Sequence, residues 1–167
     1  MKLRALAQKD APLMLEWMYD PDVVAHLSPA FATKTLEDCQ RFIAASLQDT
    51  ENRNLAVADD ADTYMGTVSL KHVDLQNREA EFAISMRSCA MGKGFSKFAM
   101  AEIIRWGFEE LGLQRIYWCV SPKNARAVRF YDKSGYCRVA ADTLPAQQWY
   151  TPEQIAEYLW YAEDKNG

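Results

Sequence analysis

The sequence predicts an α/β protein, of the α+β kind, in which a mixed sheet of six to seven strands is flanked by about four helices. Helical patterns come first, three strand patterns separated by polar turns follow, and strand and helix patterns then alternate. The 167 residues are about half apolar and one quarter charged, which is the size and composition of one ordinary globular domain. We therefore expect a single domain over residues 1–167.

The N-terminal part predicts a short strand over residues 2–6 and two amphipathic helices. Asp10 is expected to cap the first helix, which extends to Tyr19. The apolar stripe of this helix consists of Leu13, Met14, Trp17 and Met18. An irregular stretch to Thr33 leads to a second helix over residues 35–47, which opens with a capping-box pattern at residues 35–38. We expect Phe42, Ile43 and Leu47 to form its buried side.

The rest of the chain predicts a meander followed by alternating elements. Strands are expected at residues 54–58, 64–73, 79–86, 116–120 and 136–140. The longest helix is expected at residues 95–111 with Gly112 as its C-cap, and a further helix runs from Asn124 to near Gly135. The tail has a helix-start pattern at residues 151–154, but we favour a strand from about Glu157.

Composition excludes several function classes. The net charge of −4 disfavours nucleic acid or an anionic membrane as the main partner, because phosphate binding needs a basic surface. The four cysteines are far apart and the two histidines lie in different segments, so no metal site is expected. The first residues lack the apolar core of a signal peptide, and no apolar run is long enough to span a bilayer. We expect a cytoplasmic protein.

A glycine-containing loop at the start of the longest predicted helix is a candidate phosphate site. The segment Met91-Gly92-Lys93-Gly94-Phe95-Ser96 follows a strand and opens this helix. Such a junction offers free backbone N–H groups and the positive end of a helix dipole, and glycines let the backbone approach phosphate oxygens. The pattern is neither a Walker loop nor a dinucleotide fingerprint. A turn without a ligand is the alternative.

The segment from Asn124 to Tyr136 resembles a motif of a known family. Its pattern N-x-x-A-x-x-[FL]-Y-x-x-x-G-[FY] is similar to the late motif of the GNAT acyltransferases. The glycine loop occupies the place of that family's earlier motif, although Met91 replaces a usual Gln or Arg and Ser96 a usual Gly or Ala. Residues 80–84 resemble the family's fourth strand. The resemblance covers about residues 54–140. The N-terminal part looks like the branch that includes ribosomal-protein N-terminal acetyltransferases and some amino-sugar acetyltransferases.

The resemblance implies a cofactor site. Strands four and five of the family part from each other, and the pantetheine arm of acetyl-CoA lies in the gap, here beside the backbone of Ile84, Ser85 and Met86. The pyrophosphate would bind the amides of residues 92–96. Asn124 would lie near the pantetheine. Arg126, Arg129 and Lys133 share a helix face, and Arg126 is taken as the cofactor-binding residue, with simple solvation of this face as the alternative. The expected cofactor-binding residues are Ile84, Ser85, Met86, Met91, Gly92, Lys93, Gly94, Phe95, Ser96, Asn124 and Arg126.

Two residues are expected to carry the chemistry. Tyr131 matches the family's general acid, which protonates the leaving thiolate, although its place in a helical stripe also suits core packing. Glu81 matches a glutamate that serves as general base in some members, while water chains replace it in others. Cys119 is expected to line a core or pocket rather than to form an acyl-enzyme.

The expected function is N-acetyl transfer from acetyl-CoA to a primary amine by direct attack in a ternary complex. The acceptor is a protein N-terminus, an amino sugar or another small amine such as a polyamine. Acidic residues near the end of the first helix, Glu16, Asp20 and Asp22, are candidates to attract a cationic acceptor. A CoA-binding sensor or scaffold without catalysis is the alternative, and a hydrolase or metal enzyme is remote. A homodimer is compatible with the resemblance.

Overall fold

The computed structural model describes residues 1–166 and forms one seven-stranded mixed sheet, as predicted. The strand order is β1-β2-β3-β4-β5-β7-β6. Only β4 and β5 pair in parallel, and the other neighbours are antiparallel. The strands are β1 (Lys2–Ala5), β2 (Arg53–Ala58), β3 (Tyr64–Asp74), β4 (Glu79–Met86), β5 (Arg115–Val120), β6 (Cys137–Arg138) and β7 (Leu159–Asp164).

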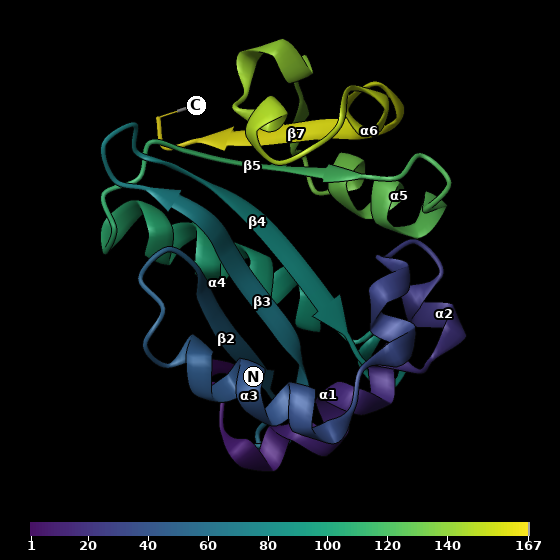
Figure 1. Ribbon diagram of the computed structural model, residues 1–167. Helices are drawn as coiled ribbons and strands as arrows, with labels where there is room; N and C mark the ends of the chain where they lie inside the picture. Colours follow the sequence, from purple (N-terminus) through teal and green to yellow (C-terminus); the bar gives the residue numbers. More distant parts are fainter. Residues whose placement is uncertain (167) are drawn as a thin grey trace.

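Helices cover both faces of this sheet. Helices α1 and α3 lie on one face and α4 on the other, while α5 flanks the end of β5 (Figure 1). The helices are α1 (Ala11–Met18), α2 (Pro21–Val24), α3 (Leu36–Ser46), α4 (Phe95–Glu109), α5 (Ala125–Lys133) and α6 (Pro152–Glu157). Short 3-10 turns lie at Gln8–Asp10, Pro29–Thr33, Ser88–Ala90, Ala141–Thr143 and Ala146–Gln148. The tail therefore contains both the helix start and the strand that its sequence suggested.

The predicted caps are partly confirmed. Thr35 forms the expected capping box, because its hydroxyl accepts from the Asp38 N–H and the Asp38 carboxylate accepts from the Thr35 N–H. The prediction for Asp10 is wrong, since its side chain caps no helix N–H. Its buried carboxylate instead accepts two bonds of 2.8 Å from the Arg4 guanidinium and one of 2.9 Å from the Ala7 N–H. A charge buried to this degree needs such partners, and a guanidinium satisfies both oxygens at once.

The predicted buried side of α3 is also partly wrong. Ile43 is fully buried, but Phe42 is 41% exposed and Leu47 is 59% exposed. Helix α3 contacts α1 through a narrow line made by Cys39 and Ile43, which are four residues apart. Phe42 and Leu47 lie outside this line.

The core falls into clusters on the two faces of the sheet. The largest cluster lies between the sheet and α4 and includes Phe82 of β4 and Trp118 of β5. A second cluster joins α1 and α3 to the other face. A third lies around β5 and β7 beneath the segment at residues 141–158. Because side chains alternate along a strand, Glu81 and Ser85 of β4 point away from the α4 side.

Strands β4 and β5 separate after a short paired stretch, as predicted. They pair only at Glu79 with Arg115, Ala80 with Ile116 and Glu81 with Tyr117. Beyond this point the two strands diverge towards their C-terminal ends, and the opening faces the region of α5 (Figure 1). Residues 82–86 of β4 keep β3 as their strand partner on the opposite edge. The sheet thus has an internal opening that begins at Glu81.

The close approach of β3 to β4 opposite this opening depends on Gly66. A Cβ placed at Gly66 would lie 2.4 Å from the backbone oxygen of Ser85 and 2.4 Å from Sδ of Met86. We expect Gly66→Ala to lower the free energy of unfolding by about 2–3 kcal/mol, because the backbone oxygen cannot move away without breaking the strand pair. The melting temperature should fall by roughly 4–12 °C.

The matched control is Gly112→Ala. Gly112 has a φ of 68°, but a Cβ placed there would meet no atom within 4 Å, so only backbone strain opposes the substitution. We expect a cost of about 1 kcal/mol at this position. Equal melting temperatures for the two variants would contradict a steric role for Gly66.

Candidate functional site

The glycine loop before α4 has the backbone geometry of an anion site. Gly92 and Gly94 have φ values of 76° and 86°, which other residues adopt at a cost. Gly94 is the N-cap of α4 and offers no side chain to the free N–H groups of the first turn. These groups and the helix dipole favour a negatively charged ligand. Phe95 is buried in the core, so its backbone alone is available to such a ligand.

The other loop residues expected at the cofactor site differ in exposure. Lys93 is exposed, whereas the side chains of Met91 and Ser96 are half-buried. The exposed Lys93 ammonium adds positive charge beside the free amides. The loop thus combines a basic side chain with backbone donors.

The start of α5 lies beside this loop. Nη2 of Arg126 would be 3.9 Å from a Cβ placed at Gly92, so the guanidinium is next to the loop backbone. Asn124 is the N-cap of α5, and its Oδ1 accepts from the Ala127 N–H at 3.2 Å. The structure therefore gives Asn124 a helix-capping role, and it brings Arg126 and Gly92 together from segments more than thirty residues apart in the sequence.

The β4 residues expected at the pantetheine line the opening between the strands. Ile84, Ser85 and Met86 pair with β3 on one side, and the pairing with β5 has ended before them. Met86 is buried and Ile84 packs against the main core. The edge of β4 that faces the opening is thus free of a strand partner over these residues, and an extended ligand could pair with it.

Tyr131 of α5 belongs to the core cluster on the α4 side of the sheet and packs over β5 and β7. It is 7% exposed and packs between aromatic rings, with centroid distances of 5.5 Å to Trp118 and 5.2 Å to Tyr161. Burial raises the pKa of its phenol above the ordinary value, with smaller contributions from neighbouring thiol and phenol groups. Among residues 1–166 its hydroxyl has no hydrogen-bond partner in the folded chain. The phenol therefore keeps its proton at neutral pH and is free to donate it.

Glu81 lies on the opposite face of the sheet from Tyr131, at the last β4–β5 pair. It is 2% exposed. Its Oε2 accepts a hydrogen bond from the hydroxyl of Tyr150, and its Oε1 lies 3.9 Å from Nζ of Lys71 and 3.5 Å from Nε2 of His72. Burial raises the pKa of this carboxyl, which the Lys71 ammonium and the Tyr150 hydrogen bond partly oppose. A buried carboxyl with a raised pKa is suited to accept a proton near neutral pH.

Three residues around Glu81 were not predicted as site residues. His72 has a φ of 53° and lies in a β-bulge between Lys71 and Asp74, which turns its side chain towards Glu81. Trp149 stacks on the imidazole with the ring centroids 3.7 Å apart and an interplanar angle of 3°. Tyr150 lies 69 residues from Glu81 in the chain. No local sequence pattern predicts these contacts. The bulge depends on strand pairing, and Trp149 and Tyr150 meet His72 and Glu81 only when the C-terminal segment packs on the sheet.

Cys119 shares this side of the sheet but is not activated. Burial raises the pKa of its thiol to about 12. At neutral pH the group is a thiol, and the thiolate is the nucleophilic form. The raised pKa therefore opposes an acyl-enzyme at Cys119, in agreement with the expectation that this residue lines a core or pocket.

The acidic residues near the end of α1 are mostly engaged in the fold. Glu16 binds the Arg87 guanidinium at 3.0 and 3.3 Å, and the Asp20 carboxylate accepts from the Asp22 N–H. Among residues 1–166, the side chain of Asp22 is the one of the three that forms no ion pair or hydrogen bond. The expectation that this group attracts a cation therefore rests on Asp22 alone.

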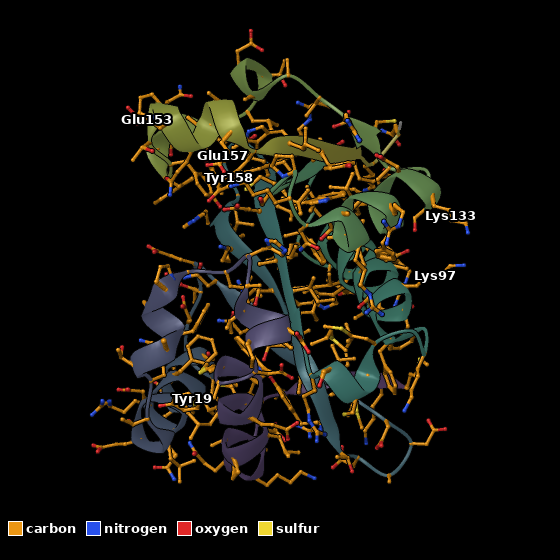
Figure 2. All side chains as sticks on the ribbon, turned by 90° about the vertical axis from the view of Figure 1, so that its right-hand side faces the viewer. Tyr19, Lys97, Lys133, Glu153, Glu157 and Tyr158 are labelled. Carbon is orange, nitrogen blue, oxygen red and sulfur yellow. The ribbon has the colours of Figure 1, made fainter. Side chains whose placement is uncertain are left out.

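Charged side chains differ between the two sides of the sheet. Lys97 of α4 and Lys133 of α5 lie on one side, and Glu153 and Glu157 of α6 lie near Tyr158 on the other (Figure 2). Within residues 1–166 neither of these two glutamates forms an ion pair. In the described part of the chain, unpaired cationic side chains thus lie on the glycine-loop side, and unpaired carboxylates lie on the Glu81 side.

Two further properties concern the described residues as a whole. No cluster of three or more potential metal ligands occurs in residues 1–166. No helix in this part of the chain has both the length and the apolar character needed to cross a bilayer.

Burial of Glu81 predicts a pH-dependent stability difference. The pKa of its carboxyl is higher in the folded than in the unfolded chain, so the folded protein binds more protons above the ordinary carboxyl pKa and loses stability as the pH rises. Glu81→Gln removes the charge. We expect its melting temperature to exceed that of the wild type at pH 8, with the difference shrinking towards pH 4.

Asp164→Asn is the control of opposite sign. Hydrogen bonds from Arg115 lower the pKa of the Asp164 carboxyl, so this group stabilises the fold above its unfolded pKa and loses that effect as the pH falls. The asparagine variant should be less stable than the wild type at pH 8 and approach it at pH 4. The raised pKa of Glu81 would be contradicted if Glu81→Gln, like Asp164→Asn, became less stable relative to the wild type as the pH rises from 4 to 8.

Solved structures share this fold over nearly the whole chain. A spermidine N-acetyltransferase from Vibrio cholerae, crystallised with CoA and spermine, superposes with a TM-score of 0.80 at 19% identity. The match covers 99% of this chain and 95% of that one. At this identity the likeness shows the fold.

Curated relatives are acetyltransferases. An uncharacterised N-acetyltransferase, p20 of Bacillus licheniformis, is 26% identical over 80% of this chain and 77% of its own length. Spermidine N(1)-acetyltransferases of Vibrio cholerae and Escherichia coli are 26% and 30% identical over 62% and 54% of this chain. The matches span 60% and 48% of the lengths of these two enzymes.

A family profile described as "Acetyltransferase (GNAT) domain" matches residues 1–136. The relatives point to polyamine acetyltransferases and do not support the expected ribosomal-protein branch. The family itself is confirmed by a match over most of the chain and by the shared fold. The chain belongs to the GNAT superfamily and is an acetyl-CoA-dependent N-acetyltransferase.

Proposed function

We propose that this acetyltransferase acts on a primary amine of a small polycation of the polyamine class, by direct attack in a ternary complex. The observation that carries the proposal is the division of the site by the sheet. The loop and helix starts expected to hold a phosphorylated cosubstrate lie on the basic side, while free carboxylates border the side of Glu81. A polyanion and a polycation would thus approach the opening between β4 and β5 from opposite sides.

The residues present fit acetyl-CoA, which supplies an activated acetyl thioester. Gly92 and Gly94 leave the loop backbone open to phosphate oxygens, and Arg126 and Lys93 add positive charge beside it. The unpaired edge of β4 at Ile84, Ser85 and Met86 suits the amides of a pantetheine arm. Met91, Phe95 and Ser96 complete the loop through their backbone groups.

Glu81 serves as general base in this proposal. A polyamine is protonated at neutral pH, so one proton must leave the reacting nitrogen before it can attack. The raised pKa of the Glu81 carboxyl brings it closer to the operating pH, where a base is most effective. Its position at the last β4–β5 pair places it at the start of the opening.

Tyr131 serves as general acid. Its phenol retains its proton because burial raises its pKa, and the hydroxyl has no competing acceptor within residues 1–166. It can therefore protonate a leaving thiolate as negative charge develops there. Acid and base stand on opposite faces of the sheet, so the two proton transfers do not compete for one group.

Two observations support a polyamine as the acceptor: the exposed carboxylates of this chain and the substrate for which its relatives are named. Glu153 and Glu157 are exposed carboxylates on the Glu81 side without ion-pair partners among the described residues, and they favour a ligand with several cationic groups. Asp22 of α2 is a further exposed carboxylate without an ion-pair partner in residues 1–166. The curated relatives that are named for a substrate are spermidine acetyltransferases. A protein N-terminus or an amino sugar carries a single amine and would use less of this charge.

The alternative expected from the sequence, a CoA-binding sensor without catalysis, is not favoured by any feature of the site. A buried carboxyl with a raised pKa lowers stability at neutral pH, and a scaffold would gain nothing from that cost. The placement of Glu81 thus favours an enzyme.

Activity is tested by thiol release from acetyl-CoA with spermidine, and with a panel of other primary amines. We expect spermidine to be acetylated and Tyr131→Phe to lower kcat by about 100-fold or more, because a positioned acid contributes at least that factor. The phenylalanine keeps the aromatic packing, so acetyl-CoA binding by calorimetry should be unchanged. Acetyl-CoA binding without transfer to any amine would support the sensor instead.

The cofactor site predicts a specific role for Arg126. We expect Arg126→Ala to raise the Kd for CoA about 10-fold, because the guanidinium beside the Gly92 loop stabilises a phosphate. Calorimetry at two salt concentrations should also show a weaker salt dependence.

Arg105→Ala is the charge-matched control. Arg105 lies near the far end of α4 and is engaged with Glu102 and Glu109. If Arg105→Ala weakened CoA binding as much as Arg126→Ala, net charge rather than a local contact would explain the effect.

A further inference from the structure

The carboxylate of Glu81 is enclosed by protein groups, although a general base must pass its proton on to solvent. With 2% of the residue exposed, Glu81 has almost no contact with solvent, and the Tyr150 hydroxyl occupies Oε2. Oε1 is buried and accepts no hydrogen bond from residues 1–166. A base used once per turnover must return its proton to water, so an exit from Oε1 is needed.

His72 is the neighbour that joins Oε1 to solvent. Its Nε2 lies 3.5 Å from Oε1, while its side chain is 25% exposed. The same imidazole lines a cavity of about 500 Å³ together with Glu79, Tyr117 and Trp149. One ring nitrogen therefore faces the buried carboxylate, and the residue also borders a cavity large enough to hold water.

We propose that His72 passes the proton taken up by Glu81 to water in this cavity. This inference rests on the proposed role of Glu81 as base. The acceptor ammonium loses a proton to the Glu81 carboxylate, and the resulting carboxyl gives a proton from Oε1 to the free electron pair on Nε2 of neutral His72. The imidazolium then releases its Nδ1 proton to cavity water, which leaves the carboxylate ionised and the imidazole neutral with its proton on Nε2. Exchange of ring protons with cavity water restores the starting tautomer, with the proton on Nδ1, before the next turnover. His72 acts through Glu81 and does not contact the reacting atoms.

Lys71 cannot accept the proton from Glu81. Its Nζ is 3.9 Å from Oε1, but an ammonium group has no free electron pair to accept a proton. It stabilises the carboxylate form instead. Desolvation and the charge of Lys71 lower the pKa of His72, which keeps the imidazole neutral and ready to accept.

The remaining groups around the pair do not offer a competing route. Tyr150 donates to Oε2, and Tyr117 and Cys119 on β5 hold their protons because burial raises the pKa of each. Beyond the imidazole the cavity is lined by the carboxylates of Glu51, Asp74 and Glu79. These negative charges favour the passage of a proton outwards.

The local backbone and stacking hold the imidazole in place. The bulge at His72 and its φ of 53° direct the side chain across the sheet, and Trp149 lies parallel on the ring at 3.7 Å. A single planar contact fixes the ring orientation without occupying its nitrogens. The arrangement therefore suits repeated proton transfer at both nitrogens.

The test is chemical rescue. Glycine adopts a positive φ freely, so His72→Gly should fold while it leaves a space that opens to the cavity. We expect kcat with spermidine, or with the best amine of the panel, to fall about 10- to 100-fold with KM and acetyl-CoA binding little changed. Added imidazole should restore at least part of kcat, with a pH dependence that follows the free base.

Two matched variants make the result specific. His72→Asn also suits a positive φ but fills the space and carries no titratable nitrogen, so it should be impaired and insensitive to imidazole. His26→Gly removes the other histidine of the chain, which is exposed, and should show no response to imidazole. A His72→Gly kcat within twofold of the wild type, or no rescue beyond that seen with His72→Asn, would overturn the relay.

Glu81→Gln separates this inference from the proposed function. A large loss of kcat in Glu81→Gln together with a normal His72→Gly would refute the relay and leave Glu81 as base. A wild-type kcat in Glu81→Gln would refute the base and the relay together. Wild-type protein that binds acetyl-CoA and acetylates no amine would refute the proposed activity itself.

Discussion

The early end of pairing between β4 and β5 is the constraint on which the site depends. Three paired residues on each strand hold the halves of the sheet together, and the divergence beyond Glu81 leaves one edge of β4 without a partner. The opening also determines which neighbours meet there, since α4 begins after β4 and α5 follows β5. Gly92 and Arg126, which come from the starts of these two helices, are adjacent for this reason. The topology of the fold, rather than proximity in the sequence, thus brings the glycine loop before α4 and the start of α5 together.

Burial of Glu81 is the second constraint, and it connects the tail to the sheet. An ionised carboxylate away from water is costly unless hydrogen bonds and opposite charge compensate. Tyr150 and Lys71 supply this compensation from a distant segment and from the neighbouring strand. The compensation is incomplete, because Oε1 accepts no hydrogen bond from the described residues and the pKa of the carboxyl stays raised. Instability of this kind is common where a group must change its protonation state.

Local patterns in the sequence predict the elements better than the contacts between them. Strand β4 has the predicted bounds, and α3 begins at the predicted capping box, because alternation and capping act within a few residues. Asp10 was predicted wrongly because its partner Arg4 lies on another element, and the exposure of Phe42 depends on how α3 meets α1. Glu81 and Tyr131 were predicted as catalytic residues from the resemblance to the family. His72 and Tyr150 were not, since a β-bulge and a contact across 69 residues leave no local signal.

The protonation states of the buried groups favour direct attack by the amine over a covalent acyl-enzyme. An acyl-enzyme would require a nucleophile that is ionised at neutral pH, yet burial keeps Cys119 as a thiol with a pKa of about 12. A direct attack requires instead that a proton leaves on the amine side and another arrives on the thiolate side. In the proposed mechanism Glu81 and Tyr131 act from opposite faces of the sheet; burial makes the Glu81 carboxylate a stronger proton acceptor and keeps the Tyr131 phenol protonated. In this proposal the sheet separates the two proton transfers, so that neither depends on the other's residue.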